Sequence, residues 1–190
     1  MKHPPVAPSA PPPLGGAPSG PAEPDPRRLL GQRVETLERA FAEIGRTRMA
    51  GLPMLHPKLK VQALGFQELD DEPLAWGILV TPWFMNLMRL PLADGAAVLP
   101  VGEVAERDVG PQRMQFIGAN EPAIGGCGRY EMCSLFSPMN EFIDHEAAVA
   151  TAREVLALLR PTPAAAIAAP LEVPARRGFL FGRSALRGPA

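Results

Sequence analysis

The spacing of apolar residues predicts a helix at each end of the structured part of the chain. Apolar side chains recur every three or four positions over residues 30–44, with charged residues between them. This is the pattern of an amphipathic helix, and we expect it to span roughly residues 26–48, where Gly51 and Pro53 then end it. A similar pattern over residues 145–159 follows Asp144, a good N-cap residue. The sequence therefore predicts two amphipathic helices.

Between these helices the pattern changes to short extended runs separated by turn residues. We predict strands, and a shorter extended piece, over residues 61–69, 74–80, 98–104, 113–119 and 129–136. Turn-forming residues at 70–73 join the first two strands into a hairpin, and residues 120–126 form a loop. Because strands do not alternate with helices, the expected fold is α+β. We expect an antiparallel sheet of about four to five strands, packed by an N-terminal and a C-terminal helix.

Residues 74–92 are the most apolar stretch of the chain, with Arg89 as its only charge. The stretch is long enough to span a bilayer, but Pro82 at its centre and Asn86 beyond it argue against membrane insertion. We instead expect a strand over residues 74–80, buried on both faces. Thr81 then caps a short helix with Pro82 in its first position.

The predicted short helix concentrates aromatic and methionine side chains, namely Trp83, Phe84, Met85 and Met88. Methionine is flexible and polarisable, so such a group can adapt to varied apolar peptides. The alternative is that these side chains plug one end of the core. The sequence leaves both interpretations open.

Composition divides the chain into three parts. Residues 1–26 are rich in proline and predict a disordered arm, residues 27–160 the folded domain, and residues 161–190 a linker and a basic, aromatic tail. The formal net charge is −1, which gives no general attraction to nucleic acid or anionic lipid. The first part lacks the apolar core of a signal peptide, so a cytoplasmic location is expected.

No group of residues predicts catalysis, a metal or a cofactor. The three histidines are scattered, and Cys127 and Cys133 lack the two-residue spacing that lets two thiolates bind one metal ion. Cys133 fits a small core residue, with a redox-active thiol as the alternative. His56, Ser134 and Ser137 are expected to shape a loop or a strand end rather than to touch a partner.

Five short strings, taken together and in order, resemble one family. They are Leu55-His56-Pro57, Val80-Thr81-Pro82-Trp83, Met114 to Phe116, Cys133 to Pro138 and Arg176 to Arg183. Across about residues 30–185, they are similar in order and spacing to the HybE/HupJ/HoxT group of [NiFe]-hydrogenase assembly chaperones.

The resemblance implies a non-enzymatic cytoplasmic protein that acts on a membrane-bound uptake hydrogenase. Its expected partners are the small-subunit precursor before twin-arginine export, the large subunit and other accessory proteins. The chain has no paired Cys-x-x-Cys, so the resemblance carries no iron-binding role to it. The alternative function is a thiol-dependent redox factor that protects the iron–sulfur subunit through Cys133.

Two groups of residues are candidates for partner binding. The first is the Trp83, Phe84, Met85 and Met88 group, and the second is the tail with Arg176, Arg177, Phe179 and Phe181. The tail also contains Arg-Arg-x-Phe-Leu, which resembles the core of a twin-arginine signal. One hypothesis is that this tail occupies the client groove until the client displaces it.

Overall fold

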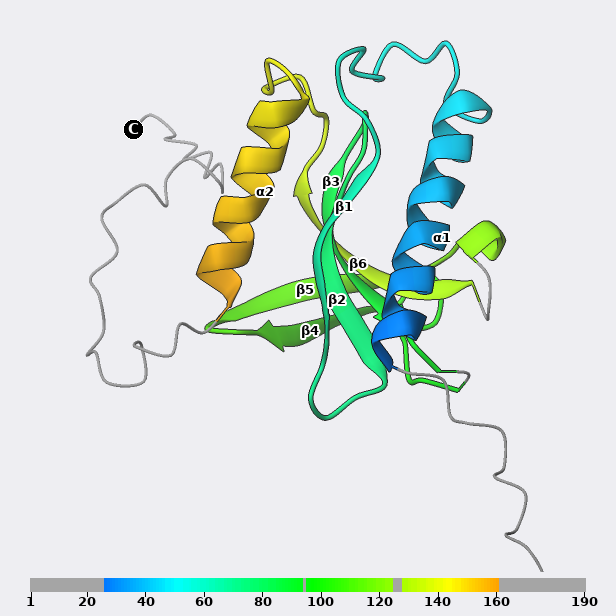
Figure 1. Cartoon of the computed structure of the whole chain (residues 1–190), viewed down its shortest axis with the longest axis vertical. Helices are drawn as coiled ribbons and strands as arrows, with labels where there is room; N and C mark the ends of the chain where they lie inside the picture. Colours follow the sequence, from blue (N-terminus) through cyan, green and yellow to red (C-terminus); the bar gives the residue numbers. More distant parts are fainter. Residues whose placement is uncertain (1–25, 94, 125–127, 161–190) are drawn as a thin grey trace, which may run out of the picture.

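The computed structural model describes residues 26–93, 95–124 and 128–160 and shows two helices against one sheet (Figure 1). The helices are α1 (Pro26–Arg46) and α2 (His145–Leu159). The strands are β1 (Gln62–Glu68), β2 (Leu74–Val80), β3 (Met85–Pro91), β4 (Val104–Val109), β5 (Gln112–Asn120) and β6 (Arg129–Phe136), with a short 3-10 helix η1 (Pro122–Ile124) before β6. The predicted α+β class is confirmed, with six strands instead of four to five.

The sheet consists of two three-stranded meanders joined side by side. Its strand order is β1-β2-β3-β6-β5-β4, and all neighbours are antiparallel. β3 and β6 therefore form the central pair. Because side chains alternate along a strand, Met85 and Leu87 of β3 pack on the α2 side, whereas Met88 and Leu90 pack on the α1 side.

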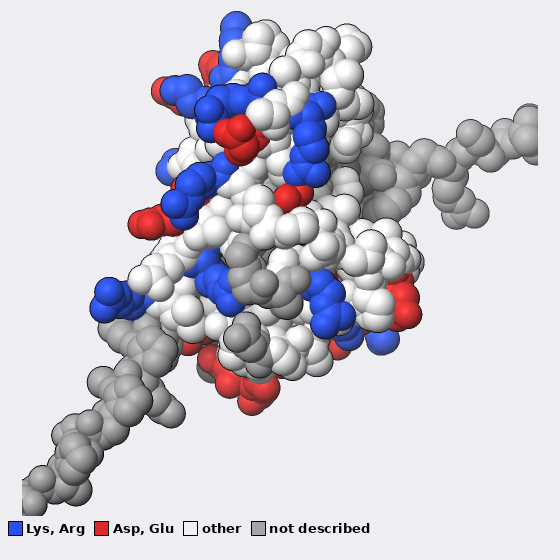
Figure 2. Space-filling model, turned by 90° about the vertical axis from the view of Figure 1, so that its right-hand side faces the viewer, with Lys and Arg blue, Asp and Glu red and all other residues white. Residues whose placement is uncertain are grey.

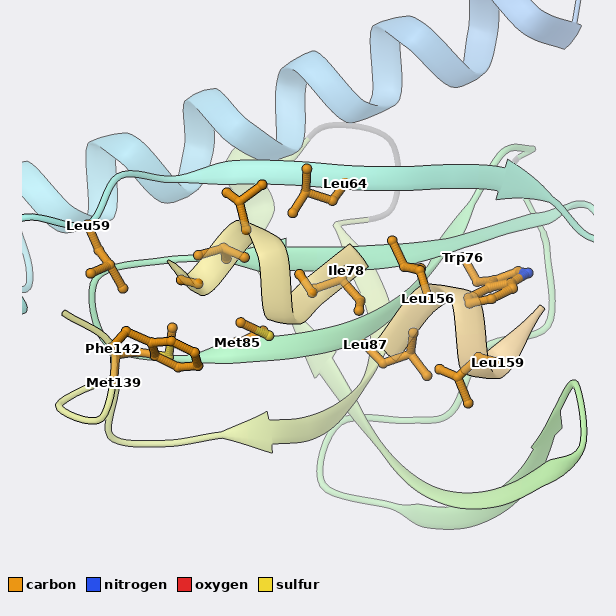
Figure 3. Close-up of a cluster of buried hydrophobic side chains, with 14 of the residues drawn as sticks. Leu59, Leu64, Trp76, Ile78, Met85, Leu87, Met139, Phe142, Leu156 and Leu159 are labelled. Atoms are coloured by element: carbon orange, nitrogen blue, oxygen red, sulfur yellow. The ribbon is translucent and has the colours of Figure 1, made fainter. Parts of the chain in front are cut away.

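Each helix covers one face of the sheet and builds its own core. On one face, Leu156 and Leu159 of α2 pack against Ile78, Leu87 and other residues of the cluster drawn in Figure 3. On the other face, α1 packs its own apolar side chains on the α1 side of β2, β3 and β6. Every residue of β2 is buried, as predicted, because helices lie on both of its faces.

The N-terminus of α2 follows the predicted chemistry, and one side chain of α1 accepts a hydrogen bond from a strand. The Asp144 side chain accepts a hydrogen bond from Ala147 N–H at 2.9 Å, which makes Asp144 the N-cap of α2 as expected. In the middle of α1, the Glu38 side chain accepts a hydrogen bond from Ala63 N–H at 2.7 Å and so satisfies a backbone donor of the edge strand β1.

The predicted helix after Pro82 is wrong, because residues 85–91 form β3. Thr81 Oγ1 accepts hydrogen bonds from Trp83 N–H at 3.2 Å and Phe84 N–H at 2.9 Å. In addition, Thr81 N–H donates to Phe84 O at 2.8 Å, which closes a hairpin turn between β2 and β3. A threonine followed by proline supplies the same local hydrogen bonds at a helix start and in a tight turn, so the local signal is ambiguous.

The extended piece predicted near residues 98–104 is displaced in the structure. Strand β4 begins at Val104, at the edge of the sheet, and its sequence Val-Ala-Glu-Arg-Asp-Val alternates exposed with half-buried or buried residues. An exposed edge strand needs few apolar residues, so its sequence carries a weak strand pattern.

The sheet also buries ions that the sequence pattern did not pair. Arg89 is 5% exposed and Glu131 is 0% exposed, and Arg89 Nη1 donates to Glu131 Oε2 at 2.6 Å. Arg107 of β4 donates two further hydrogen bonds to the same carboxylate. This cluster fixes the outer meander to β3. Within the described ranges, no helix is both long and apolar enough to cross a membrane.

Candidate functional site

An apolar cleft lies between the C-terminal end of α1, the loop of residues 47–61 and the β2–β3 turn. We call it the Pro82 cleft. Its volume is about 300 Å³, and it is lined by Ala42, Gly45, Arg46, Leu55, His56, Pro57, Val61 and Pro82. Two of the strings noted in the sequence, His56-Pro57 and Pro82-Trp83, therefore meet in space although they lie far apart in the chain.

A backbone hydrogen bond holds the two walls of the Pro82 cleft together. His56 N–H donates to Pro82 O at 2.9 Å, which ties the loop to the hairpin turn. His56 Nδ1 accepts a hydrogen bond from Lys58 N–H at 3.3 Å, and this turn aims the chain towards the buried Leu59. The expectation that His56 shapes its loop agrees with these bonds, and His56 also lines the cleft.

Trp83 borders the cleft, and its ring packs against Gly45 of α1. Its ring stacks on Phe41 at a centroid distance of 6.4 Å and meets Phe84 edge-on at 5.5 Å. A Cβ atom added to Gly45 would lie 3.3 Å from the Trp83 ring, a tight contact that would push the ring a few tenths of an ångström away from the α1 backbone. The indole is thus half-buried and held by contacts with Phe41, Phe84 and Gly45.

The chemistry of the Pro82 cleft suits an apolar guest. Its only ionic lining group is Arg46, which pairs with Glu43 on the helix surface. The neighbouring loop exposes further apolar side chains, with Leu52 at 43% and Met54 at 49% exposure. In the part of the chain that the structure describes, no three His, Cys, Asp or Glu side chains are grouped as metal ligands would be. The cleft can therefore bury apolar side chains but shows no catalytic arrangement.

A second hollow lies on the same side of the sheet, past Phe84. We call it the Asn86 cleft. Its volume is about 230 Å³, and it is lined by Phe84, Asn86, Ile117, Met132, Ser134 and Ser137. Because Phe84 packs against both Trp83 and Phe41, the aromatic pair Trp83–Phe84 separates the two clefts.

Asn86 is the polar centre of this second hollow. It is 4% exposed, its Nδ2 donates only to Met132 Sδ at 3.4 Å, and its Oδ1 has no hydrogen-bond partner. Rotating the amide by 180° would exchange the two atoms and leave the –NH₂ group poorly paired instead. A buried polar group without a partner costs roughly 1–3 kcal/mol.

The structure separates the four residues predicted as a partner surface. Met85 and Met88 are completely buried in different core clusters, so the structure corrects their prediction as surface residues in favour of the core alternative. Trp83 and Phe84 are half-buried and border the clefts, and their contact with a partner stays a prediction. The tail candidates Arg176, Arg177, Phe179 and Phe181 lie outside the described residues.

Cys133 gains no sign of reactivity from its surroundings. It is half-buried, packs on the α2 side of the sheet opposite Leu87, and burial raises the pKa of its thiol. A raised pKa lowers the fraction of the nucleophilic thiolate. Cys127 lies outside the described residues.

The sequence pattern assigned no binding role to several residues of the two clefts. Asn86 and Arg89 are the polar residues of an otherwise apolar strand, which is a readable signal once that strand is recognised. Ala42 and Gly45 of α1 gave no signal beyond their small size, because only the packing of α1 on the β2–β3 turn reveals their place. Ser134 and Ser137, expected to shape the strand end, line the Asn86 cleft.

Comparisons with known proteins agree on one family. The family model described as "[NiFe]-hydrogenase assembly, chaperone, HybE" matches residues 32–182. The chain is 46% identical to protein HoxT of Cupriavidus necator over 168 residues, which cover 82% of this chain and 92% of that protein. It is 38% identical to the hydrogenase expression/formation protein HupJ of Bradyrhizobium diazoefficiens, over 66% of this chain and 70% of that protein.

A solved structure shares the fold. The solution structure of HybE from Escherichia coli matches with a TM-score of 0.53 and 24% sequence identity, over 80% of this chain and 91% of that chain. The arrangement of two helices on a six-stranded sheet, the family model and the similar proteins lead to one conclusion: the chain belongs to the HybE family of [NiFe]-hydrogenase assembly chaperones.

Proposed function

We propose that this chain is a non-enzymatic maturation chaperone that acts in the cytoplasm on a membrane-bound uptake [NiFe]-hydrogenase. It holds the small-subunit precursor before twin-arginine export, with the large subunit as a further client. Membership of the assembly-chaperone family supports the general role. The choice of client and the place where it binds rest on the Pro82 cleft.

The observation that carries the proposal is the apolar character of the Pro82 cleft beside the half-buried Trp83. An export signal contains an apolar segment of about 7–15 residues, which must be shielded from water while the precursor waits. A cleft of about 300 Å³ is large enough for apolar side chains of such a segment but too small for a folded domain. Leu52 and Met54 extend the apolar surface at its rim.

The surface charge favours recognition by apolar contact. Figure 2 looks onto the side that carries α1, where basic and acidic side chains are interspersed. With a formal net charge of −1, the protein has no strong field to steer a charged partner. We therefore expect client affinity to change little with salt concentration.

Co-purification from hydrogenase-expressing cells tests the proposal. Wild-type protein is expected to retain the small-subunit precursor, and Trp83→Ala is expected to lose it. Removing an aromatic anchor from an interface costs about 2 kcal/mol or more, which corresponds to roughly a thirtyfold loss of affinity. Cys133→Ser is expected to keep both the complex and hydrogenase maturation, whereas the redox alternative predicts that maturation is lost while binding stays intact.

A cleft-filling variant protects this test against misfolding. Trp83 packs on Phe41, so Trp83→Ala can weaken the fold itself. Ala42→Leu adds volume inside the cleft on a helix that tolerates leucine, and the matched control Ala150→Leu adds the same volume at an exposed site of α2. Retention of the precursor by a well-folded Ala42→Leu variant would refute the Pro82 cleft as its site.

A further inference from the structure

The Asn86 cleft contains a polar group that the folded chain leaves unsatisfied. Asn86 lies in β3 between Met85 and Leu87, in a strand buried along its whole length. Its amide oxygen has no partner, and its nitrogen reaches only a thioether sulfur, a weak acceptor. An apolar residue of similar size at this position would avoid that cost. The fold alone therefore gives no reason for asparagine here.

The strand beside Asn86 is irregular at the same point. Asn86 pairs with Ser134 of β6, whereas its neighbour Met85 pairs with Phe136, so Leu135 is an extra residue in β6. Such bulges interrupt regular pairing and redirect side chains next to binding sites. Here the bulge accompanies an exposed Ser134 directly opposite Asn86, with Ser137 beyond it at the wall of the cleft.

The other walls are apolar, and one of them is adaptable. Met132 closes the cleft beside Asn86, and methionine can rotate away at little cost. Ile117 of β5 is register partner to both Met132 and Val104, which makes one row across three strands. Ile117 is 36% and Val104 52% exposed, so this apolar row runs from the cleft to the sheet edge.

A polar floor with apolar walls matches the chemistry of an extended peptide. A peptide in extended form presents backbone N–H groups along its edges, while its side chains point alternately to its two faces. The amide oxygen of Asn86 is itself buried in the absence of a guest, so Met132 has to move aside before a donor can reach it. We propose that the Asn86 cleft is a second subsite for the client peptide, in which the Asn86 amide oxygen then accepts one backbone N–H while an apolar side chain packs on Ile117 and Met132. This inference rests on the proposed function, and it places the client across both sides of the Trp83–Phe84 pair.

The geometry favours this occupant over an isolated apolar molecule. An apolar molecule would leave the Asn86 oxygen unpaired, whereas a peptide backbone supplies the missing donor. Hydroxyl groups of Ser134 and Ser137 at the wall can donate to a peptide carbonyl as well. The chain's own residues 161–190 are the competing occupant, and the experiment below separates the two.

Backbone methylation of the peptide gives a direct test. The probe is a synthetic peptide with the sequence of the small-subunit export signal, together with a series in which one backbone N–H at a time is N-methylated. With full-length wild-type protein, one methylated position is expected to bind about tenfold more weakly, the loss typical of a single hydrogen bond. Asn86→Leu is expected to bind the unmodified peptide about tenfold more weakly and to be insensitive to methylation at that same position.

Two further variants keep the test independent of folding. Ser134→Trp fills the cleft from an exposed position and is expected to weaken binding, whereas Asn140→Leu removes an exposed asparagine outside the cleft and is expected to bind as wild type does. Equal methylation profiles for wild type and Asn86→Leu, or unaltered binding by Ser134→Trp, would overturn the subsite. Those results leave the Pro82 cleft and the proposed function intact.

Two further results would separate failure of the proposed function from occupation of the cleft by the chain's own tail. If wild-type protein does not bind the peptide at all, the proposed function fails, and this inference fails with it. The Asn86 side-chain NH₂ signal in NMR spectra of the full chain reports on the other occupant. A shift of that signal in Phe179→Ala/Phe181→Ala protein without peptide would show that the chain's own tail fills the cleft, which overturns the client peptide as its occupant.

Discussion

Glu131 shows how one buried residue holds two parts of the sheet together. Its carboxylate accepts hydrogen bonds from Arg89 at 2.6 Å, from Arg107 at 3.0 and 3.2 Å, and from Leu99 N–H at 3.0 Å. Burial alone would raise the pKa of Glu131, but the bonds from Arg107 and the charge of Arg89 outweigh burial and lower it. The carboxylate is therefore ionised, and it compensates the buried Arg89.

Replacing this carboxylate is expected to lower the free energy of unfolding substantially. Glu131→Gln leaves Arg89 buried with Glu72 as its one remaining ionic partner among the described residues, at 2.8 Å near the surface. Breaking a buried ion pair from one side costs about 3–5 kcal/mol, so we expect a loss of about 3 kcal/mol in the free energy of unfolding, measured with urea. The control Glu106→Gln removes an exposed pair with Arg113 and should change stability very little. A similar, small effect of both variants would contradict a structural role for the cluster.

His145 makes the stability of the fold depend on pH. Its Nδ1 accepts a hydrogen bond from Lys60 N–H at 3.3 Å, and its Nε2 lies 2.8 Å from Gln62 Oε1, an arrangement that needs the neutral ring. Burial and the charge of Lys60 lower the pKa of His145. The α2 N-terminus, where His145 is the first residue, also disfavours a cation.

The sign of this pH effect follows from proton binding. Because the unfolded chain, with a pKa of about 6.5, binds the proton more readily than the folded one, stability is complete above that pH and decreases as the pH falls towards the lowered folded pKa. We expect the melting temperature of wild-type protein to decrease between about pH 7 and pH 5. In His145→Gln, which cannot titrate, the decrease should be smaller; identical pH profiles would exclude His145 as its source.

At the scale of elements, the β2–β3 turn decides the position of both clefts. Thr81 is completely buried, and its hydroxyl accepts two backbone hydrogen bonds and donates one to Phe84 O at 2.9 Å. Thr81→Val keeps the shape but leaves these backbone groups without the hydroxyl, which we expect to cost about 1–3 kcal/mol in thermal or urea unfolding. Thr47→Val, which removes an exposed hydroxyl bond to Glu43 O, is the matched control and should cost less.

The same turn shows what could be predicted from the sequence and what could not. Residues whose partners are local were predicted well: α1 ends at Arg46 against an expected end near residue 48, and β6 has the predicted bounds. β3 was missed because Thr81-Pro82 is compatible with a helix start, and only pairing with β2 and β6 distinguishes the two. The clefts depend on such long-range pairings, so Trp83 and Phe84 could be predicted as candidates, but their surroundings could not.

At the scale of the whole molecule, one face of the sheet carries the larger core and the other face carries the two clefts. The α2 face carries the larger core and the half-buried Cys133. The α1 face carries both clefts, on either side of the Trp83–Phe84 pair, and the apolar row that reaches β4. Because α1 covers only part of its face, the proposed client can lie along the sheet without displacing a helix.

This asymmetry predicts where a bound client peptide changes the protein. Titration of ¹⁵N-labelled full-length protein with the small-subunit export-signal peptide should shift backbone NMR signals around Gly45, His56, Ile117 and Ser134, which border the two clefts. Signals of the exposed side of α2, such as that of Leu158, should stay in place, since the sheet separates them from the peptide. Shifts concentrated on α2 would place the client on the opposite face and refute both clefts together, whereas shifts at Gly45 and His56 alone would retain the Pro82 cleft and remove the second subsite.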